Sequence, residues 1–386
     1  MSIEPGPSHG VMEGDGFYNR HAKLPADGAA TALPLLEKAI RKVVLDPDDG
    51  PIVIADYGSS QGKNSQVPMK VVIKGLKARL ATGRSISVYH IDQSANDFNS
   101  LFKVLENDPD RYVADQVDVY PAAIGRSFYE KVLPANSVHL GWSSYAAMWL
   151  SQIPVSLPNH FLAVCSNGTA RAAFDRQAAQ DWNTFLSLRA RELRPGARLV
   201  VVFPALSDDG LVGLEPLFNQ ANAVLQEMVA DGAITSEERS RMTIRVHPCS
   251  QRDRLAPFQS NGEFQQLTVE HSQLAVVSDA AWEQFVLDRD NDALAARRSG
   301  FLRSIFAPSL ACALSPVRAG NGASGAVFAD QLEQRLKHRL LSQPAEMRTF
   351  AHSVVLAKAR LHARGRARKT QPHFQKLIPG VMTSWI

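Results

Sequence analysis

Hydrophobic positions in the first hundred residues alternate between a helical and an extended pattern. Apolar residues spaced for one helix face predict a helix over residues 33–45. Residues 52–55 form a continuous apolar run, which is typical of a buried parallel strand. A second helical pattern covers residues 67–80, and a second strand at 85–91 ends in Asp92. A strand, a glycine-rich loop, a helix and another strand predict the first half of a doubly wound α/β sheet.

The later sequence continues this alternation but adds long helical stretches. We expect a helix around residues 182–193, a turn at 194–196, and mainly helical structure over 207–260 and 280–342, with a glycine-rich break at 320–325. The remaining apolar runs predict strands at 136–140, 197–203, 267–270 and 349–358. Insertions into an open α/β sheet usually cover the carboxyl ends of its strands, where ligands bind.

Composition places the chain among ordinary globular proteins. Its 386 residues are 45% hydrophobic and 21% charged, which suits one large or two ordinary domains. A net charge of +4 is nearly neutral for this length and argues against a nucleic-acid binder. The widely spaced Cys165, Cys249 and Cys312 form neither a metal pair nor a disulfide framework, so we expect a reducing compartment. No run approaches the roughly 20 apolar residues of a membrane span, and residues 1–10 lack a signal peptide's apolar block. We therefore expect a cytoplasmic protein.

The loop after the first strand allows more than one chemistry. Gly58 and Gly62 are separated by three residues, and Asn64 follows Lys63. A phosphate-binding P-loop needs four residues between its glycines and Ser or Thr after the lysine, so this motif is excluded.

The same loop matches the nucleophile elbow G-x-S-x-G, with Ser60 in the position of the nucleophile. This interpretation predicts an acyl hydrolase. The elbow usually follows several strands, whereas here it follows the first strong one. The hydrolase therefore stays as an alternative.

A third interpretation is a loop that binds a nucleoside cofactor. Glycines let the backbone approach a ligand closely, and Asp92 at the end of the next strand is placed to accept both ribose hydroxyls. The loop lacks the G-x-G-x-x-G spacing that suits a pyrophosphate. A cofactor without phosphates, such as S-adenosylmethionine, fits better. The plain alternative is an ordinary β–α turn with a solvated Asp92.

A family resemblance favours the third interpretation. Residues 54–64 resemble the first motif of the SABATH carboxyl methyltransferases, which methylate salicylate, benzoate, jasmonate and indole-acetate. Further stretches resemble later motifs of that family in the same order: 92–99, 127–129, 143–154 and 192–198. The similarity is specific over residues 14–204 and continues more weakly to near residue 360.

The resemblance implies a class I methyltransferase core, which is a Rossmann-like α/β sheet, with an α-helical cap built from insertions. It implies S-adenosylmethionine as methyl donor, S-adenosylhomocysteine as product and a small-molecule carboxylic acid as acceptor, with neither nucleic acid nor membrane as partner. It is also compatible with a homodimer. The expected division is an N-terminal arm over the site at 1–30, a core at 31–206, cap helices at 207–261 and 280–342, core strands within 262–279 and 343–360, and a basic tail at 361–386.

Carried over by position, the resemblance also names site residues. Those expected to bind the cofactor are Tyr18, Asp56, Gly58, Ser60, Asn64, Asp92, Gln93, Ser127 and Phe128. Those expected to line the acceptor pocket are Trp142, Tyr145, Met148, Trp149 and Phe218. Trp149 would donate its indole N–H to the carboxylate. By spacing alone, Tyr145, Met148 and Trp149 equally suit one buried face of a helix.

The arm departs from the family pattern. Ala22 stands where the family has Ser, Pro25 where it has Gln, and Trp142 where it has a pocket His. In the family the Ser contacts the cofactor and the Gln contacts the acceptor's carboxylate, so the expected carboxylate clamp is missing here, and Arg20 or His21 is the candidate to replace it.

The expected chemistry needs no catalytic base and no metal. A carboxylic acid has a pKa of about 4 and is ionised at neutral pH, so its oxygen is already a nucleophile. The enzyme then has to align oxygen, methyl carbon and sulfur, and such positioning supplies about 7–11 kcal/mol in favourable cases. A cofactor-binding protein that has lost catalysis stays as a further alternative.

Overall fold

A computed structural model describes residues 10–45, 50–80, 83–315 and 323–360 of the protein. The basic tail expected at 361–386 and the first half of the expected break at 320–325 lie outside the described residues. Eight strands form one sheet in the order β3-β2-β1-β4-β5-β8-β7-β6. Their bounds are β1 (Ile52–Tyr57), β2 (Ile86–Asp92), β3 (Val119–Gly125), β4 (Val138–Ser144), β5 (Leu193–Ala205), β6 (Glu263–Phe264), β7 (Leu267–Val277) and β8 (Thr349–Lys358).

The sheet reverses direction only in its second half. Strands β3, β2, β1, β4 and β5 pair in parallel. Strand β8 then inserts antiparallel to both β5 and β7, and the short β6 forms a hairpin with β7. The parallel half brings the carboxyl ends of four adjacent strands, β2, β1, β4 and β5, to one edge, where an α/β sheet binds ligands.

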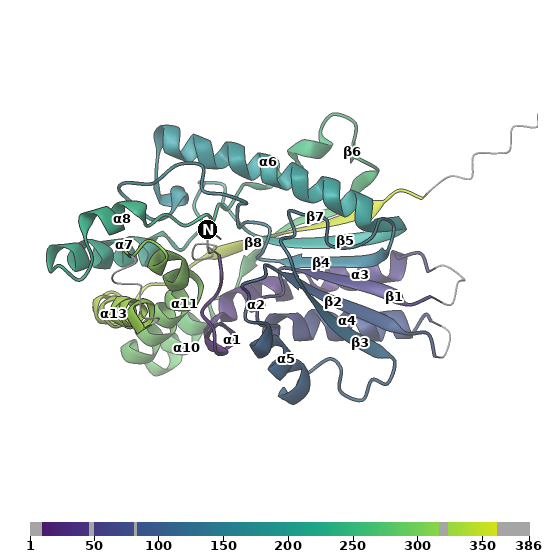
Figure 1. Ribbon diagram of the computed structural model, residues 1–386, viewed down its shortest axis with the longest axis horizontal. Coiled ribbons are helices and arrows are strands. Elements are labelled where there is room, and N and C mark those ends of the chain that lie inside the picture. Colours follow the sequence, from purple (N-terminus) through teal and green to yellow (C-terminus); the bar gives the residue numbers. More distant parts are fainter. Residues whose placement is uncertain (1–9, 46–49, 81–82, 316–322, 361–386) are drawn as a thin grey trace, which may run out of the picture.

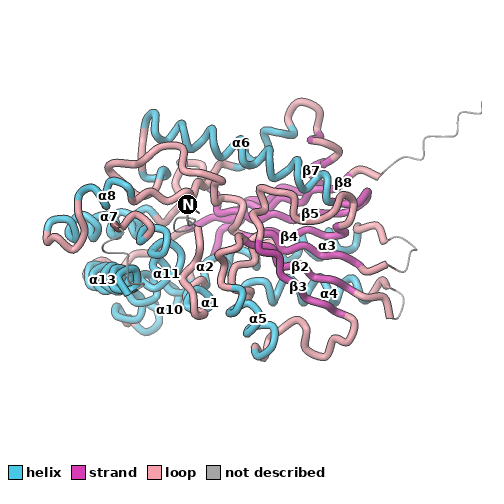
Figure 2. Tube along the Cα trace, viewed as in Figure 1, coloured by secondary structure: helices cyan, strands magenta, loops and turns pink. Residues whose placement is uncertain are grey.

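Helices cover both faces of the sheet and extend beyond one end (Figures 1 and 2). The helices are α1 (Phe17–His21), α2 (Lys23–Ala30), α3 (Leu33–Lys42), α4 (Gln66–Lys77), α5 (Phe98–Asn107), α6 (Gly168–Glu192), α7 (Glu215–Ala230), α8 (Ser236–Arg241), α9 (Gln251–Leu255), α10 (Ala280–Asp288), α11 (Asn291–Ala311) and α13 (Ala323–Leu340). Helices α7, α8, α10, α11 and α13 gather beyond the carboxyl ends of the parallel strands.

The alternation of side chains along β1 explains the two covered faces. Ile52 and Ile54 belong to a buried cluster with α3 and α4, whereas Ala55 and Tyr57 belong to another cluster with α6. Successive strand residues point to opposite faces, so a continuous apolar run requires cover on both sides. A third apolar cluster joins α7, α11 and α13 into the helical cap.

The structure confirms the predicted α/β fold and alters several local predictions. Strand β8 occupies the predicted range of 349–358. Strand β3 was not predicted, because Pro121 and two alanines give it a weak strand pattern; as an edge strand it tolerates the proline. The turn predicted at 194–196 is part of β5, where the pairing with β4 shifts register and Gly196 has a φ of 83°.

The helical prediction for 207–260 is only partly correct. Helices α7, α8 and α9 lie within it, but residues 242–250 are irregular apart from isolated bridges. One such bridge pairs Val246 with Trp149, so this loop runs beside the segment that follows β4. Gly325, the end of the predicted glycine-rich break, lies inside α13.

Candidate functional site

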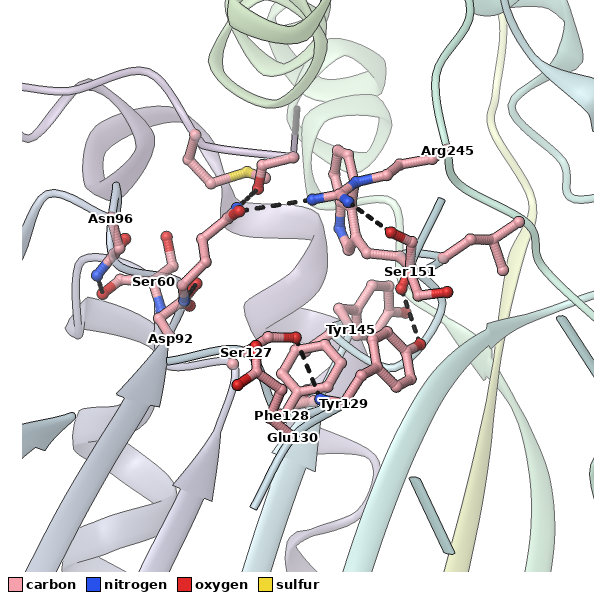
Figure 3. Close-up of a pocket in the computed structure, with 18 of the residues that line it drawn as sticks. Ser60, Asp92, Asn96, Ser127, Phe128, Tyr129, Glu130, Tyr145, Ser151 and Arg245 are labelled. Atoms are coloured by element: carbon pink, nitrogen blue, oxygen red, sulfur yellow. Dashed lines mark hydrogen bonds between the residues drawn. The ribbon is translucent and has the colours of Figure 1, made fainter. Parts of the chain in front are cut away.

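A cavity of about 540 Å³ lies at the carboxyl ends of the parallel strands (Figure 3). It is lined by seven of the residues expected to bind a cofactor and two of those expected to bind an acceptor. These are Tyr18, Gly58, Ser60, Asp92, Gln93, Ser127 and Phe128, with Tyr145 and Trp149. We call it the first cavity.

The loop after β1 requires glycine at its closest approach. Gly58 has a φ of 88°, a conformation that L side chains rarely adopt, and an added Cβ would overlap the Cβ of Ala146. Ser60 also takes a left-handed conformation, with a φ of 48°. This path turns the backbone N–H of Ser60 toward Asp92.

Asp92 ends β2 with its carboxylate at the cavity wall. Its two oxygens accept hydrogen bonds from the backbone N–H groups of Ser60 (2.7 Å) and Gln93 (2.8 Å). Burial raises the pKa of Asp92 to about 6, and these two hydrogen bonds oppose the rise. Each oxygen keeps a further lone pair, so the carboxylate can accept hydrogen bonds from a vicinal diol.

Asp56 is buried and does not line the cavity, and it contacts residues that follow or lie beside the glycine loop. Its Oδ2 accepts from Ser65 Oγ (2.6 Å) and lies 2.9 Å from Nδ1 of His90, whose Nε2 lies 2.8 Å from the hydroxyl of Tyr112. Both ring nitrogens of His90 are therefore engaged. Asn64 is also absent from the lining, and its Nδ2 donates to the carbonyl of Ala22.

The loop that carries Ser127 and Phe128 is tied to α6 by a buried arginine. Arg189 donates to the carbonyls of Phe128 (2.9 Å) and Glu130 (3.3 Å). The same guanidinium pairs with Glu192 at 2.9 Å, and both side chains are buried. A long helix therefore fixes the backbone that faces the first cavity.

Glu192 extends this support to the first strand and the loop beyond. It accepts from the hydroxyl of Tyr57 (2.9 Å) and from the backbone N–H of Val132 (3.1 Å). The buried carboxylate is thus satisfied on both oxygens, as a charge removed from water requires.

The segment after β4 is not helical, so the helix-face interpretation of Tyr145, Met148 and Trp149 is wrong. Tyr145 has a φ of 55°, and its N–H donates to the carbonyl of Val202. The hydroxyl of Tyr129 donates to the carbonyl of Trp149 at 2.8 Å. The helix-like spacing of these three residues therefore falls in an irregular loop, whose backbone is hydrogen-bonded to neighbouring strands and loops.

A second, narrow cavity of about 50 Å³ adjoins the first. Tyr145 lines both, and the ring of Trp149 in the first cavity lies 6.3 Å from that of Phe306 in the second. The second cavity is apolar, and its lining includes Pro25, Met148, Phe218, Phe301 and Phe306. Of the predicted acceptor residues, Met148 and Phe218 therefore face this cavity.

Trp142 lines neither cavity. It is 1% exposed and packs in the cluster between the sheet and α4, where it pairs in register with Asp56. The tryptophan at this position therefore fills the core. Arg20 and His21 also lie away from both cavities and line a third one, of about 470 Å³.

The structure disfavours Ser60 as a nucleophile. Within the described residues its Oγ has no hydrogen-bond partner. A nucleophilic serine needs an adjacent base, and His90 is engaged by Asp56 and Tyr112.

Several lining residues were not singled out by the sequence. Asn96, inside a matched motif, donates from Nδ2 to the carbonyl of Ser60 at 2.8 Å. Arg245 donates to the carbonyl of Ser151 (3.1 Å) and contacts Gln93 Oε1 (3.5 Å) across the top of the cavity (Figure 3). No local pattern marks Arg245, because it reaches the cavity from a loop expected to be helical.

The described ranges contain neither a metal-type cluster of side chains nor a helix of the membrane-spanning kind. No group of three or more His, Cys, Asp or Glu side chains in them could hold a metal ion. None of the helices in these same ranges is long and apolar enough to cross a membrane.

Comparisons with known proteins agree with this geometry. Methyltransferase LUC1 of Fusarium sp is 32% identical over 233 residues, which are 58% of this chain and 59% of the relative. The match thus spans about three fifths of the length of the fungal relatives. Salicylate carboxymethyltransferase of Clarkia breweri is 26% identical over 72% of this chain and 78% of its own.

The fold has a solved counterpart. A loganic acid methyltransferase with SAH superimposes with a TM-score of 0.71 at 22% identity, covering 90% of this chain and 98% of that one. The family described as SAM dependent carboxyl methyltransferase matches residues 9–356, nearly the whole chain. The protein therefore belongs to the S-adenosylmethionine-dependent carboxyl methyltransferase family.

Proposed function

We propose that the protein transfers a methyl group from S-adenosylmethionine to a carboxylate oxygen of a small hydrophobic acid. The products are the methyl ester and S-adenosylhomocysteine. The observation that carries this proposal is that two unlike cavities share Tyr145: the first is lined by both polar and apolar side chains, and the second is apolar. A methyl donor and an apolar acid need such adjoining spaces.

The residues present fit the cofactor. The carboxylate of Asp92 is placed to accept from the two ribose hydroxyls, and the missing side chain of Gly58 keeps open a space that a Cβ would fill. We assign the ribose to Asp92 with Gln93 beside it, the adenine to Ser127 and Phe128, and the methionine end to the 58–60 loop. Tyr18 covers this end from the arm. Asp56 and Asn64 take supporting positions in this proposal.

The chemistry follows from the side chains at the junction. When bound, S-adenosylmethionine supplies an electrophilic methyl group on a sulfonium. The acid arrives ionised, so a C–O bond forms while the C–S bond breaks and its electron pair stays on sulfur. No histidine of the described ranges lines either cavity, and this chemistry needs none. Tyr145 and Trp149 hold the carboxylate in line and exclude water.

The first experiment is calorimetry with S-adenosylhomocysteine, followed by a panel of aromatic, indolic, fatty and terpenoid acids with methyl-labelled donor. We expect binding and label in an ester. Absence of both would reject the proposal. Binding without turnover of any acid would instead favour a cofactor-binding protein that has lost catalysis.

A substitution separates the hydrolase alternative. Ser60→Ala removes a nucleophile if the protein is an esterase and should abolish ester hydrolysis. If Ser60 only lines the cofactor cavity, methyl transfer persists with weaker cofactor affinity. Trp149→Phe keeps the ring but loses the N–H donor, and should raise KM for the acid with little change in cofactor affinity.

We also propose a cellular location, an oligomeric state and a domain division. We propose a cytoplasmic protein that is able to form a homodimer, supported by its cysteine spacing and by the family resemblance. Light scattering at several protein concentrations tests the dimer. We also propose the expected division into arm, core and cap, which limited proteolysis tests.

A further inference from the structure

A third cavity adjoins the apolar one and, among the described residues, shares no lining side chain with the first cavity. Its volume is about 470 Å³, and Leu24, Leu214 and Phe301 line both it and the narrow second cavity. It is bordered by α1, α2, α10 and α11, and α1 and α10 each pack against α11 (Figure 1). The three cavities therefore form a row, with Tyr145 at the first junction and these three apolar side chains at the second.

The charges that line the third cavity do not balance. Four cations and two carboxylates line it. Each carboxylate already has a cation: Asp27 pairs with Lys23 at 2.9 Å, and Asp279 pairs with Arg298 at 2.5 Å. Asp279 is further occupied by backbone N–H groups at the start of α10 and before β8.

Arg20 and Arg297 supply the excess positive charge. Arg20 donates to the backbone carbonyl of Asp15 and lies over the ring of Phe17, and neither contact neutralises it. Arg297 makes no hydrogen bond or ion pair with any described residue; its charge is felt by Asp288, an exposed carboxylate outside the lining.

His21 adds no charge to this surface at neutral pH, because burial lowers its pKa. The surplus is therefore carried by two guanidinium groups, which suit recognition of a carboxylate, sulfate or phosphate.

The second cavity limits what can join the two ends. The second cavity is apolar and has about 50 Å³, against about 540 Å³ and 470 Å³ for its two neighbours, so we expect the part of an acceptor that lies in it to be slim and apolar. The reacting carboxylate must lie at the Tyr145 junction, next to the cofactor cavity. A chain that continues through the apolar cavity ends among Arg20 and Arg297.

We propose that the acceptor is an elongated acid with a slim apolar middle and a second anionic group at its far end, for which the third cavity is the distal subsite. This inference rests on the proposed methyl transfer. Arg20 and Arg297 then select the substrate without touching the reacting atoms.

The test compares a straight-chain monocarboxylic acid with the α,ω-dicarboxylic acid of the same length, across several lengths, using methyl-labelled donor. At lengths that reach the third cavity we expect kcat/KM to favour the diacid about tenfold, beyond the factor of two that its two reactive ends provide. The preference should decrease as ionic strength rises, because the two cations are accessible to solvent.

The double variant Arg20→Gln, Arg297→Gln should lose the preference while kcat/KM for the monoacid stays within about twofold. The double variant Arg176→Gln, Arg191→Gln removes the same charge from two exposed positions on α6, and as the matched control it should keep the preference. Unchanged affinity for S-adenosylhomocysteine verifies that the double variant is folded.

Phe301→Trp provides a second measurement, because a larger ring at the shared wall should slow long acids more than short ones. Turnover of monoacids without a diacid preference, or a preference that survives the double variant, would overturn this inference and leave the proposed function standing. Failure of every acid, with no binding of S-adenosylhomocysteine, would instead reject the proposed function itself.

Discussion

At the scale of single residues, the first cavity depends on the absence of a side chain at Gly58 and on the carboxylate of Asp92. Gly58 takes a left-handed backbone conformation and leaves empty the space beside Ala146 that a Cβ would fill, and only glycine allows both. Asp92 keeps a carboxylate at the wall although burial disfavours its charge. Both features are local, and both have direct tests.

Gly58→Ala should lower stability by about 1–3 kcal/mol and strongly weaken binding of S-adenosylhomocysteine, because the alanine is strained and overlaps Ala146. Gly83→Ala is the matched control: Gly83 has a similar φ of 86°, but an added Cβ there meets open space. Denaturant unfolding and calorimetry measure the two effects. Equal losses in both variants would show that strain alone, and not clearance, explains Gly58.

Cofactor affinity should fall as pH decreases through about 6, the raised pKa of Asp92. Only the ionised carboxylate accepts from both ribose hydroxyls, and binding favours this form, so complex formation near pH 6 releases a proton. Calorimetry in buffers of different ionisation enthalpy measures that release. Asp92→Asn should bind weakly at every pH without proton release; a wild-type affinity that is flat from pH 5 to 8 would contradict the assignment.

At the scale of elements, helix α6 holds the loop of Ser127 and Phe128 that lines the first cavity. Its buried pair of Arg189 and Glu192 holds the carbonyls of residues 128 and 130 and the hydroxyl of Tyr57. The helix therefore couples sheet packing to the shape of the first cavity.

Arg189→Ala should destabilise the protein by about 3–5 kcal/mol, because it leaves Glu192 buried without its cation. Arg191→Ala, on the exposed face of the same helix, should change stability by less than about 0.5 kcal/mol. Chemical denaturation compares the two. A small effect at Arg189 would mean that the pair adds nothing beyond a hydrophobic contact.

At the scale of the whole molecule, the first cavity is closed by segments that are distant in sequence. Gly10 accepts from Gln93 Nε2, Glu13 accepts from Gln61 Nε2, and Arg245 reaches Gln93 from the cap. The arm, the sheet loops and the cap meet at this site, so a ligand here joins three parts of the protein.

Saturating S-adenosylhomocysteine should therefore slow amide hydrogen exchange in residues 10–22 and 242–250 as well as in the strand loops. At one hundred times Kd it should raise the free energy of unfolding by about 2.7 kcal/mol. Amides of the distant α13 that exchange through local opening should not change. Protection restricted to the loops after β1 and β2 would show that the arm and the loop at 242–250 do not close on the ligand.

Much of the fold was predictable because its signals are local. Apolar runs along the chain mark β1, β2, β5 and β8, and the glycines and Asp92 mark the cofactor edge. Strand β3 was missed because a proline and alanines carry little strand propensity, and pairing with β2 decides its conformation. The motifs likewise placed Ser127 and Tyr145 near the site, since each follows a strand end.

The amino-acid sequence by itself determined the α/β core, the family, and the loop and carboxylate that line the first cavity, because these depend on short-range patterns of residue type. Only the tertiary structure decided that Trp142 fills the core, that Asp56 contacts Ser65 and His90 and not the cavity, and that Arg245 reaches the cavity. It also decided that Arg20 lies at a third cavity beside Arg297. Those facts depend on which faces of distant elements pack together, and burial and charge at such contacts leave no periodic signal along the chain.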